Sequence, residues 1–253
     1  MGENNDIVIE LNNVSKIFSK NYKSARIQLT NILKESFLGC PEKYTLQKGE
    51  FWALKNISFT IKRNEKVAIL GSNGSGKSTL LKMLNGIYLP NQGEININGN
   101  ISSVLELSSG FKAELSGHEN IYLKFALLGK KKEEVDKIIN DIISFSELED
   151  FMETPLKHYS SGMKSKLGFA IVTSIIPEIL ILDEVFAAGD KKFRIKSEER
   201  IKELYQSTTT ILVTHSMKIV KDVADRVIIL QKGEKVFDGG VGEGIKFYNL
   251  IMK

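Results

Sequence analysis

The spacing of apolar positions in the first third of the chain predicts strands that lead into one helix. Residues 7–11 and 51–61 have the alternating pattern of strands, and residues 66–70 form a compact apolar run that is typical of a buried strand. Directly after a glycine-rich stretch, residues 77–84 continue with helical spacing and few helix breakers. We therefore expect a strand, a tight turn and a helix in immediate succession.

In the middle of the chain, the spacing of apolar residues changes from that of strands to that of helices. Residues 93–98 and 101–107 alternate and predict a turn-separated pair of strands. The stretches that then carry helical spacing are residues 119–128, 135–145 and 162–176. They indicate a helical subdomain, over approximately residues 108–176, that is inserted into an α/β core.

Alternation of strands and helices returns in the last third. The predicted elements are strands at 179–182 and 210–214, a helix at 191–205, and a hairpin of residues 227–230 and 235–238 around Gly233. Strands that alternate with helices and long crossovers favour a mainly parallel sheet flanked by helices. We expect residues 1–253 to form a single α/β domain with its inserted parts.

Length and charge narrow the class of protein. The chain has 253 residues, which suffices for one large α/β domain, and 42% hydrophobic residues, as in globular proteins. Its 35 basic and 31 acidic residues are scattered, so the net charge of +4 does not imply a nucleic-acid partner. The one basic run, Lys130 to Lys132, is expected at a solvated helix start.

Cysteine content and hydropathy bear on the compartment. Cys40 is the single cysteine, which excludes an intrachain disulfide and fits a reducing environment. No apolar run approaches the ~20 residues of a spanning helix, and the N-terminus lacks a signal-peptide pattern. We expect a soluble, cytoplasmic chain that can still bind a component of a membrane.

The glycine-rich turn matches the phosphate-binding pattern G-x-x-x-x-G-K-[ST]. Its residues are Gly71, Ser72, Asn73, Gly74, Ser75, Gly76, Lys77, Ser78 and Thr79. Glycines let backbone N–H groups approach a triphosphate closely, and the helix that follows directs its positive dipole end to the same anion. Lys77 is expected to contact the β- and γ-phosphates, and Ser78 to ligate Mg²⁺. The motif predicts ATP-type nucleotide binding rather than an ordinary turn before a helix.

A second group of candidate residues follows two predicted strands. Asp183 and Glu184 come directly after the apolar run 179–182, and His215 follows the strand that ends at Thr214. Asp183 is the candidate oxygen ligand for Mg²⁺, and Glu184 the candidate general base for the attacking water. His215 is expected to contact the γ-phosphate from the same edge of the sheet. An acid pair alone is more often a simple helix start, but the phosphate loop favours the catalytic interpretation.

The order of these motifs resembles the ATP-binding cassette (ABC) family over nearly the whole chain. The family signature Leu-Ser-Gly-Gly-Gln has its counterpart in Tyr-Ser-Ser-Gly-Met at residues 159–163, between the phosphate loop and the acid pair. The resemblance implies a P-loop NTPase (RecA-like) core with an antiparallel β subdomain and an inserted helical subdomain. It further implies a homodimer in which Ser160, Ser161 and Gly162 contact the γ-phosphate of the opposite subunit's ATP.

The resemblance assigns roles to further residues, some of which match the family pattern better than others. An aromatic ring that stacks on adenine corresponds best to Phe18, with Trp52 as a rival. Glu106 stands in the region of the family's coupling glutamine and is the candidate replacement near magnesium. Asp190 corresponds to the loop that signals across the dimer, although the usual serine-alanine-leucine before it is absent.

Where the sequence departs from the family pattern, it resembles the ATPases of polysaccharide exporters. These departures include the 159–163 signature, the stretch Leu105 to Phe111, residues 114–121 and the Ala-Gly-Asp that ends at Asp190. This subgroup moves O-antigen, capsular polysaccharide or teichoic acid on a lipid carrier, together with a membrane-spanning permease subunit. The resemblance therefore implies a peripheral protein at the cytoplasmic face of the inner membrane. The alternative is the ATPase of a different ABC transporter, an importer or a drug exporter, or an ABC ATPase without a transport role.

Two further expectations concern segments of this subgroup. Residues 19–50 are an insertion in which residues 24–38 form an amphipathic helix, with an apolar face that includes Leu29 and Leu33. Its polar face carries Arg26 and Lys34, so the helix either packs on the protein's own core or meets anionic head groups. Many members carry a C-terminal carbohydrate-binding domain, and we expect none here because the chain ends at Lys253.

Overall fold

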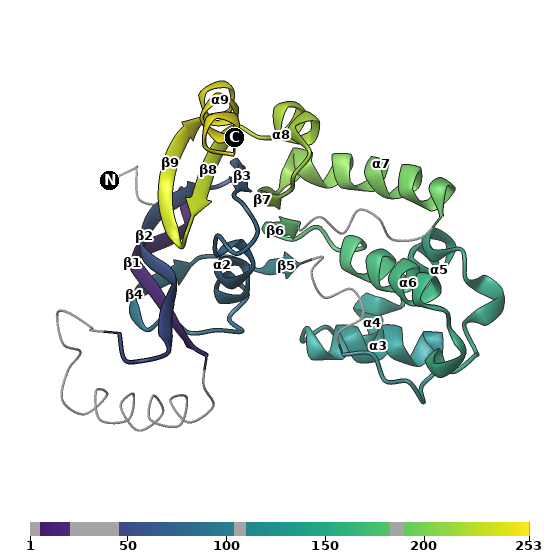
Figure 1. Cartoon of the computed structure of the whole chain (residues 1–253). Helices are drawn as coiled ribbons and strands as arrows, with labels where there is room; N and C mark the ends of the chain where they lie inside the picture. Colours follow the sequence, from purple (N-terminus) through teal and green to yellow (C-terminus); the bar gives the residue numbers. More distant parts are fainter. Residues whose placement is uncertain (1–5, 21–45, 104–109, 183–189, 253) are drawn as a thin grey trace. The chain divides into compact units, whose positions relative to one another are not determined.

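A computed structural model provides the structure of the chain, and it describes residues 6–20, 46–103, 110–182 and 190–252. These residues divide into two compact units (Figure 1). The first unit consists of Met1–Gly99 and Val213–Lys253, and the second of Asn100–Leu212. Among the helices that the structure describes, none combines the length and the apolar composition of a membrane span. The amphipathic helix expected at residues 24–38 lies outside the described residues.

An antiparallel sheet in the first unit contains β1 (Ile7–Ser19), β2 (Glu50–Lys62) and β4 (Gln92–Ile97), in the order β2-β1-β4. Strand β1 continues well past the residues 7–11 of the sequence pattern. Asn13 has a positive φ of 51°, and the register with β2 shifts between Leu11 and Val14. A bulge at this point interrupts the apolar alternation without ending the strand, because the ladder resumes on its far side.

The predicted pairing of residues 93–98 with residues 101–107 is wrong. Strand β4 pairs with β1, with Ile97 opposite Ile9 and Ile95 opposite Leu11. Residues 101–103 form β5 (Ile101–Ser103), which belongs to the second unit and pairs with β6 (Ile179–Leu182) in parallel. Alternating residues predict a strand, but its partner depends on apolar residues that are distant in the sequence.

The first unit also holds the expected strand, turn and helix. Strand β3 (Lys66–Leu70) is buried from Val67 to Leu70, and helix α2 (Lys77–Leu84) begins seven residues after it ends. Strand β8 (Arg226–Gln231) lies parallel to β3 and antiparallel to β9 (Glu234–Gly240). Positive φ angles at Lys232 (49°) and Gly233 (82°) form the turn between them, which confirms the predicted hairpin.

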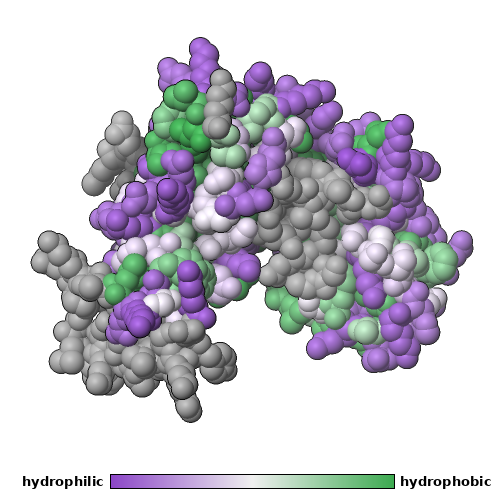
Figure 2. Space-filling view, in the orientation of Figure 1, coloured by the Kyte–Doolittle hydropathy of each residue, from purple (hydrophilic) through white to green (hydrophobic). Residues whose placement is uncertain are grey.

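Two helices of the first unit are not among the predictions from sequence. Helix α8 (Met217–Val223) follows strand β7 (Thr209–Val213), and α9 (Val241–Ile251) packs on β8 and β9. Tyr248 and Ile245 of α9 join the buried cluster around Val227 and Ile229. Apolar colour gathers on the surface around α9 and β9 in Figure 2. Short helices with few buried residues give a weak periodic signal, and packing on the hairpin stabilises α9.

The second unit combines parallel strands with helices. Its strands β5, β6 and β7 (Thr209–Val213) run parallel in that order. Its helices are α3 (Gly117–Leu127), α4 (Lys132–Val135), α5 (Ile139–Ser146), α6 (Ser161–Thr173) and α7 (Lys191–Ser207), with 3-10 turns at Glu149–Phe151 and Leu156–His158. The helix predicted at residues 135–145 is interrupted by a turn between α4 and α5. Lys131 and Lys132 are exposed at the start of α4, as expected.

Three phenylalanines hold the helices of the second unit together. Phe145 on α5, Phe169 on α6 and Phe193 on α7 have ring centroids 5.6 to 5.9 Å apart. Phe193 is fully buried, and Phe169 is 2% exposed. Mutual contacts of large rings bury much apolar area, so this cluster holds α5, α6 and α7 against one another.

Arg226 is the centre of an ion-pair network in the first unit. Its guanidinium donates to both carboxylate oxygens of Asp238, at 2.6 and 2.9 Å, and to Glu65 Oε1 at 3.1 Å. Lys235 Nζ lies 2.7 Å from the same Asp238 carboxylate. Burial alone raises the pKa of Asp238, but the hydrogen bonds from Arg226 and Lys235 outweigh it and hold that pKa below its usual value.

We predict that Asp238→Asn lowers the free energy of unfolding at pH 7 by about 2 kcal/mol, because Arg226 loses its bidentate charged partner. A carboxyl with a lowered pKa in the folded state stabilises the protein above its unfolded pKa and loses that effect as the pH falls. The difference between parent and variant in urea denaturation should therefore shrink below about pH 4. Glu234→Gln, which breaks the exposed pair with Lys55, is the control and should change stability by less than about 0.5 kcal/mol. An Asp238→Asn effect no larger than this control would contradict the prediction.

Candidate nucleotide-binding site

The turn between β3 and α2 adopts a conformation that requires glycine. Gly74 has a φ of 77° and Gly76 a φ of 109°, in the region that residues with a Cβ rarely adopt. A Cβ on Gly76 would lie 2.6 Å from Leu54 Cδ2 and 2.7 Å from the Ala53 carbonyl oxygen. The turn therefore packs directly on β2, and Gly76 is needed both for its φ and for this close approach.

The start of α2 has the properties of an anion site. Its N-cap residue, Gly76, has no side chain to accept a hydrogen bond, and the first turn contains no acidic residue. Ser78 and Thr79 lie in the first turn, where the N–H groups of a helix have no acceptor within the helix. The positive end of the helix dipole adds to their effect, so this turn attracts an anion such as a phosphate.

Side chains of the turn add to this anion site. Lys77 Nζ donates to the carbonyl oxygens of Gly71, at 2.7 Å, and Ser72, at 3.1 Å, which places the ammonium over the turn. Ser75 is 1% exposed, and its Oγ has no hydrogen-bond partner within the described part of the chain. Its backbone is held from both sides, because Ser75 N donates to Ser72 and Gly233 N donates to Ser75. These residues fit the phosphates of a nucleotide.

The expected magnesium ligands are described only in part. Ser78 is exposed in the first turn of α2, where its hydroxyl suits a hard cation beside the phosphates. Asp183, Glu184 and Glu106 lie outside the described residues. No cluster of metal-ligating side chains occurs among the residues that the structure describes. The described part of the site thus fits Mg²⁺ through one hydroxyl, and the acidic ligands stay a prediction.

The two rivals for the adenine contact lie on opposite faces of β1 and β2. Phe18 is paired with Phe51, whereas Trp52 is paired with Ile17. The Phe18 ring lies 5.5 Å from Tyr88 and 6.3 Å from Phe51, measured between centroids. Phe18 is therefore part of an aromatic cluster with Tyr88 and Phe51. The choice between the two rings stays a prediction.

His215 lies where the sequence pattern places it, just beyond the carboxyl end of a strand. Strand β7 ends at Val213, Thr214 is buried, and His215 is exposed. Thr214 Oγ1 accepts the N–H of Ser216, and Ser216 caps α8 by accepting the N–H of Ile219. Hydrogen bonds of the neighbouring Thr214 and Ser216 thus fix the backbone around His215. A contact of His215 to a γ-phosphate stays a prediction.

The signature residues form the N-terminus of α6 in the second unit. Ser160 Oγ caps the helix by accepting the N–H of Met163 at 3.2 Å. Ser160 and Ser161 are exposed, and the first turn of α6 contains no acidic residue. A Cβ on Gly162 would meet no atom closer than Ser160 Oγ, at 3.8 Å. Packing within the unit therefore does not require a glycine there, although glycine weakens a helix by about 1 kcal/mol relative to alanine.

Asn120 supports the segment before the signature and is absent from the sequence-based candidates. It is fully buried, and its side-chain amide donates to the carbonyl oxygens of Lys112, Leu115 and Ser116. Leu115 in turn accepts the N–H of Leu156, which lies just before the signature. A single asparagine among other polar residues of α3 gives no signal of this role in the sequence. Its bonds show only in the folded unit.

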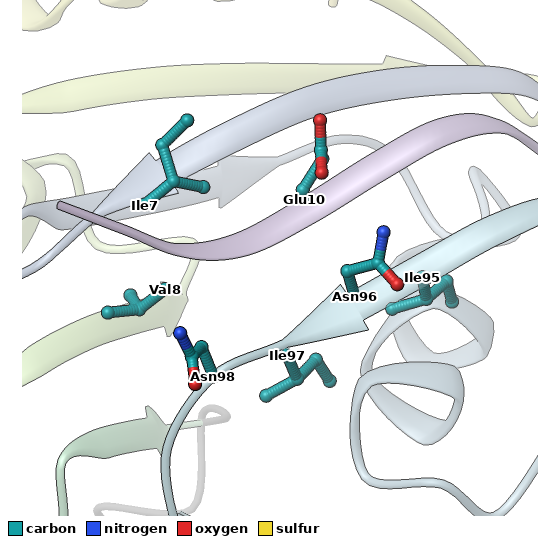
Figure 3. Close-up of a pocket in the computed structure, with 7 residues that line it drawn as sticks. All are labelled: Ile7, Val8, Glu10, Ile95, Asn96, Ile97 and Asn98. Atoms are coloured by element: carbon teal, nitrogen blue, oxygen red, sulfur yellow. The ribbon is translucent and has the colours of Figure 1, made fainter. Parts of the chain in front are cut away.

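A pocket of about 470 Å³ lies between β1 and β4, away from the phosphate loop in the sequence (Figure 3). It is lined by Ile7, Val8, Glu10, Ile95, Asn96, Ile97 and Asn98. Glu10 and Asn96 are directly paired across the two strands, and Asn98 N donates to Val8 O. The lining offers a single carboxylate and includes none of the phosphate-loop residues.

Strand, glycine-rich turn and helix define a P-loop α/β protein, and comparison with known proteins gives its family. The family model described as ABC transporter matches residues 54–187. The chain therefore belongs to the ABC transporter family, which confirms the resemblance and the fold class expected from the sequence.

Relatives and solved structures agree with this assignment. The chain is 41% identical over 211 residues to the O-antigen export system ATP-binding protein RfbB of Klebsiella pneumoniae, which covers 83% of this chain and 86% of the relative. It is 45% identical over 220 residues to the teichoic acids export ATP-binding protein TagH of Lactococcus lactis, covering 87% of this chain but only 46% of that longer protein. A solved ATP-binding subunit of an ABC transporter has a TM-score of 0.72 at 23% identity, over 96% of this chain and 94% of that one.

We predict that Lys77→Ala weakens ATP binding by about 10- to 100-fold, because it removes a charged donor to the phosphates. Isothermal titration calorimetry with ATP measures the effect. Lys82→Ala is a matched control, since Lys82 carries the same charge at the opposite end of α2. An affinity within twofold of the parent in Lys77→Ala would contradict the role of the loop.

Proposed function

We propose that this chain is the ATP-hydrolysing subunit of an ABC exporter that moves a lipid-linked polysaccharide across the cytoplasmic membrane. The observation that carries the proposal is its similarity to RfbB, an O-antigen export ATP-binding protein, at 41% identity over 86% of that protein's length. The similarity to TagH, a teichoic acids export ATP-binding protein, points to the same class of cargo. The subunit works with a membrane-spanning permease at the cytoplasmic face of the membrane.

The hydrolysis reaction is assigned to residues of the phosphate loop and of two strand ends. Lys77 neutralises charge on the β- and γ-phosphates, and the first-turn amides of α2 hold the same oxygens. Glu184 accepts the proton of the attacking water, and His215 donates to the γ-phosphate. Mg²⁺, when bound, neutralises charge between the β- and γ-phosphates. Ser78, Asp183 and Glu106 are the residues proposed to hold it.

Two copies of the chain are proposed to share each ATP. The exposed start of α6, with Ser160, Ser161 and an uncrowded Gly162, suits the γ-phosphate of an ATP on the partner's phosphate loop. A glycine that its own unit does not require is consistent with close approach by another molecule. The solved dimeric cassette MJ0796 shares the fold of this chain, with a TM-score of 0.68 at 23% identity.

We predict that Glu184→Gln lowers steady-state ATP turnover by a factor of about 10² to 10⁴ and leaves ATP binding intact, because the amide keeps the shape but not the basicity. Export follows turnover, so surface polysaccharide should be lost in cells that carry only this variant. Glu199→Gln, an exposed position on α7, is the control for both assays. Turnover within a few-fold of the parent would remove Glu184 as the base. If the parent protein hydrolyses ATP but cells that lack the chain keep their surface polysaccharide, the proposed cargo is contradicted.

Shared sites predict complementation between defective copies. Lys77→Ala and Gly162→Asp should each be inactive as homodimers, because one lacks the phosphate contact and the other blocks the signature. A mixed dimer keeps one composite site with both parts intact, so single-turnover hydrolysis should return on mixing. No return of hydrolysis in a verified mixed dimer would contradict sharing across the interface.

A further inference from the structure

Helices α5, α6 and α7 of the second unit meet at one ammonium group. Lys166 Nζ lies 2.8 Å from Asp190 Oδ2 and 3.2 Å from Glu147 Oε2. Its charge also lies over the Phe193 ring, 5.0 Å from the centroid. The Lys166 side chain is 14% exposed, so its charge is largely removed from water and depends on these partners.

Asp190 uses both of its carboxylate oxygens at this junction. Oδ1 caps α7 by accepting the N–H of Phe193 at 3.0 Å, and Oδ2 accepts from Lys166. The hydrogen bonds from Lys166 and from the Phe193 amide lower the pKa of Asp190 to about 2. The carboxylate therefore stays ionised at neutral pH and keeps both contacts.

Glu147 brings the end of α5 to the same point. It is the C-cap residue of α5, with a φ of 57° in the left-handed region, and its carboxylate also lies 3.7 Å from Lys192 Nζ. Burial lowers the pKa of Lys166, but hydrogen bonds to Asp190 and Glu147 outweigh burial and raise it. The three charges thus persist together across the neutral range.

Packing alone does not explain why a charge is placed here. Phe145, Phe169 and Phe193 already pack the same helices on one another. Lys166 is largely buried, whereas the Asp190 side chain is 60% exposed. Such a half-buried ion pair adds little net stability, because desolvation offsets the attraction, but it fixes the orientation of the groups that it joins. The two groups joined here are the helix that Ser160 caps and the helix that Asp190 caps.

We propose that Lys166 is a positioning residue for ATP hydrolysis, holding the Ser160 end of α6 in a fixed orientation to the Asp190 cap of α7. The inference rests on the ATPase function and on the assignment of Ser160 to the composite site, and it is independent of the cargo. Through this link the signature moves as one body with the start of α7. An error of about 1 Å in such placement can reduce a rate by as much as 10²-fold.

Lys166→Met tests the proposal, because it keeps the stem and removes the charge. We expect kcat for ATP to fall by at least about tenfold while KM changes less than about twofold, since the phosphate loop is untouched. Lys166→Arg should recover turnover to within about threefold of the parent, because its guanidinium can donate to both carboxylates.

Arg200→Met is the matched control. Arg200 also joins α7 to α5, with 2.6 Å from its Nη2 to Asp141 Oδ2 and 4.7 Å from its Cζ to the Phe145 centroid, but it does not touch Asp190. Its side chain is 22% exposed, close to that of Lys166. We expect a comparable loss in urea denaturation and an unchanged kcat. A kcat loss in both variants that follows their loss of stability would reduce Lys166 to a structural contact.

Asp190→Asn provides a second route if Lys166→Met does not fold. The amide oxygen still caps α7, whereas the charge that holds Lys166 is gone. The kcat losses of Lys166→Met and Asp190→Asn should not add in the double variant, since both break one link. Additive losses, or parental kcat in either foldable variant, would overturn the proposal. A parent without ATP turnover would contradict the proposed function as well, whereas an incorrect cargo leaves these measurements unchanged.

Discussion

Close approach of backbone to backbone around the phosphate loop is the constraint on which the first unit depends. Amides that bind a phosphate cannot also donate to side-chain caps. The turn must therefore be held by contacts with neighbouring strands. Gly76 meets β2 at Ala53, and Gly233 in the β8–β9 turn donates to Ser75 and accepts from Lys55. Two sheets therefore hold the same short turn. Backbone hydrogen bonds and close packing thus fix the turn, which is what electrostatic preorganisation requires.

The second unit presents its part of the chemistry through helix N-termini. Ser160 and Asp190 each cap a helix with a side-chain oxygen, and Lys166 joins the two helices through Asp190. Apolar contacts among Phe145, Phe169 and Phe193 supply cohesion but little directional preference. Charged hydrogen bonds supply the direction. Cohesion and orientation are thus carried by different groups in this unit.

Predictions that rest on local patterns agree with the structure, and those that need a distant partner do not. The strand, turn and helix at residues 66–84 and the hairpin around Gly233 follow from neighbouring residues, and both form as expected. The assumed pairing of residues 93–98 with 101–107 fails because Ile95 and Ile97 find Leu11 and Ile9 instead. Helix α9 was missed because its apolar face is defined by β8 and β9, which it covers.

The sequence by itself determined the P-loop, the order of motifs and hence the family, because these depend on residue types at fixed short spacings. It also placed His215 after its strand and Ser160 at a helix start. Only the tertiary structure showed that Lys166, Asp190 and Glu147 meet at one junction and that Asn120 supports the segment before the signature. These residues are far apart in the chain, and only packing of the folded unit brings their hydrogen-bonding groups together.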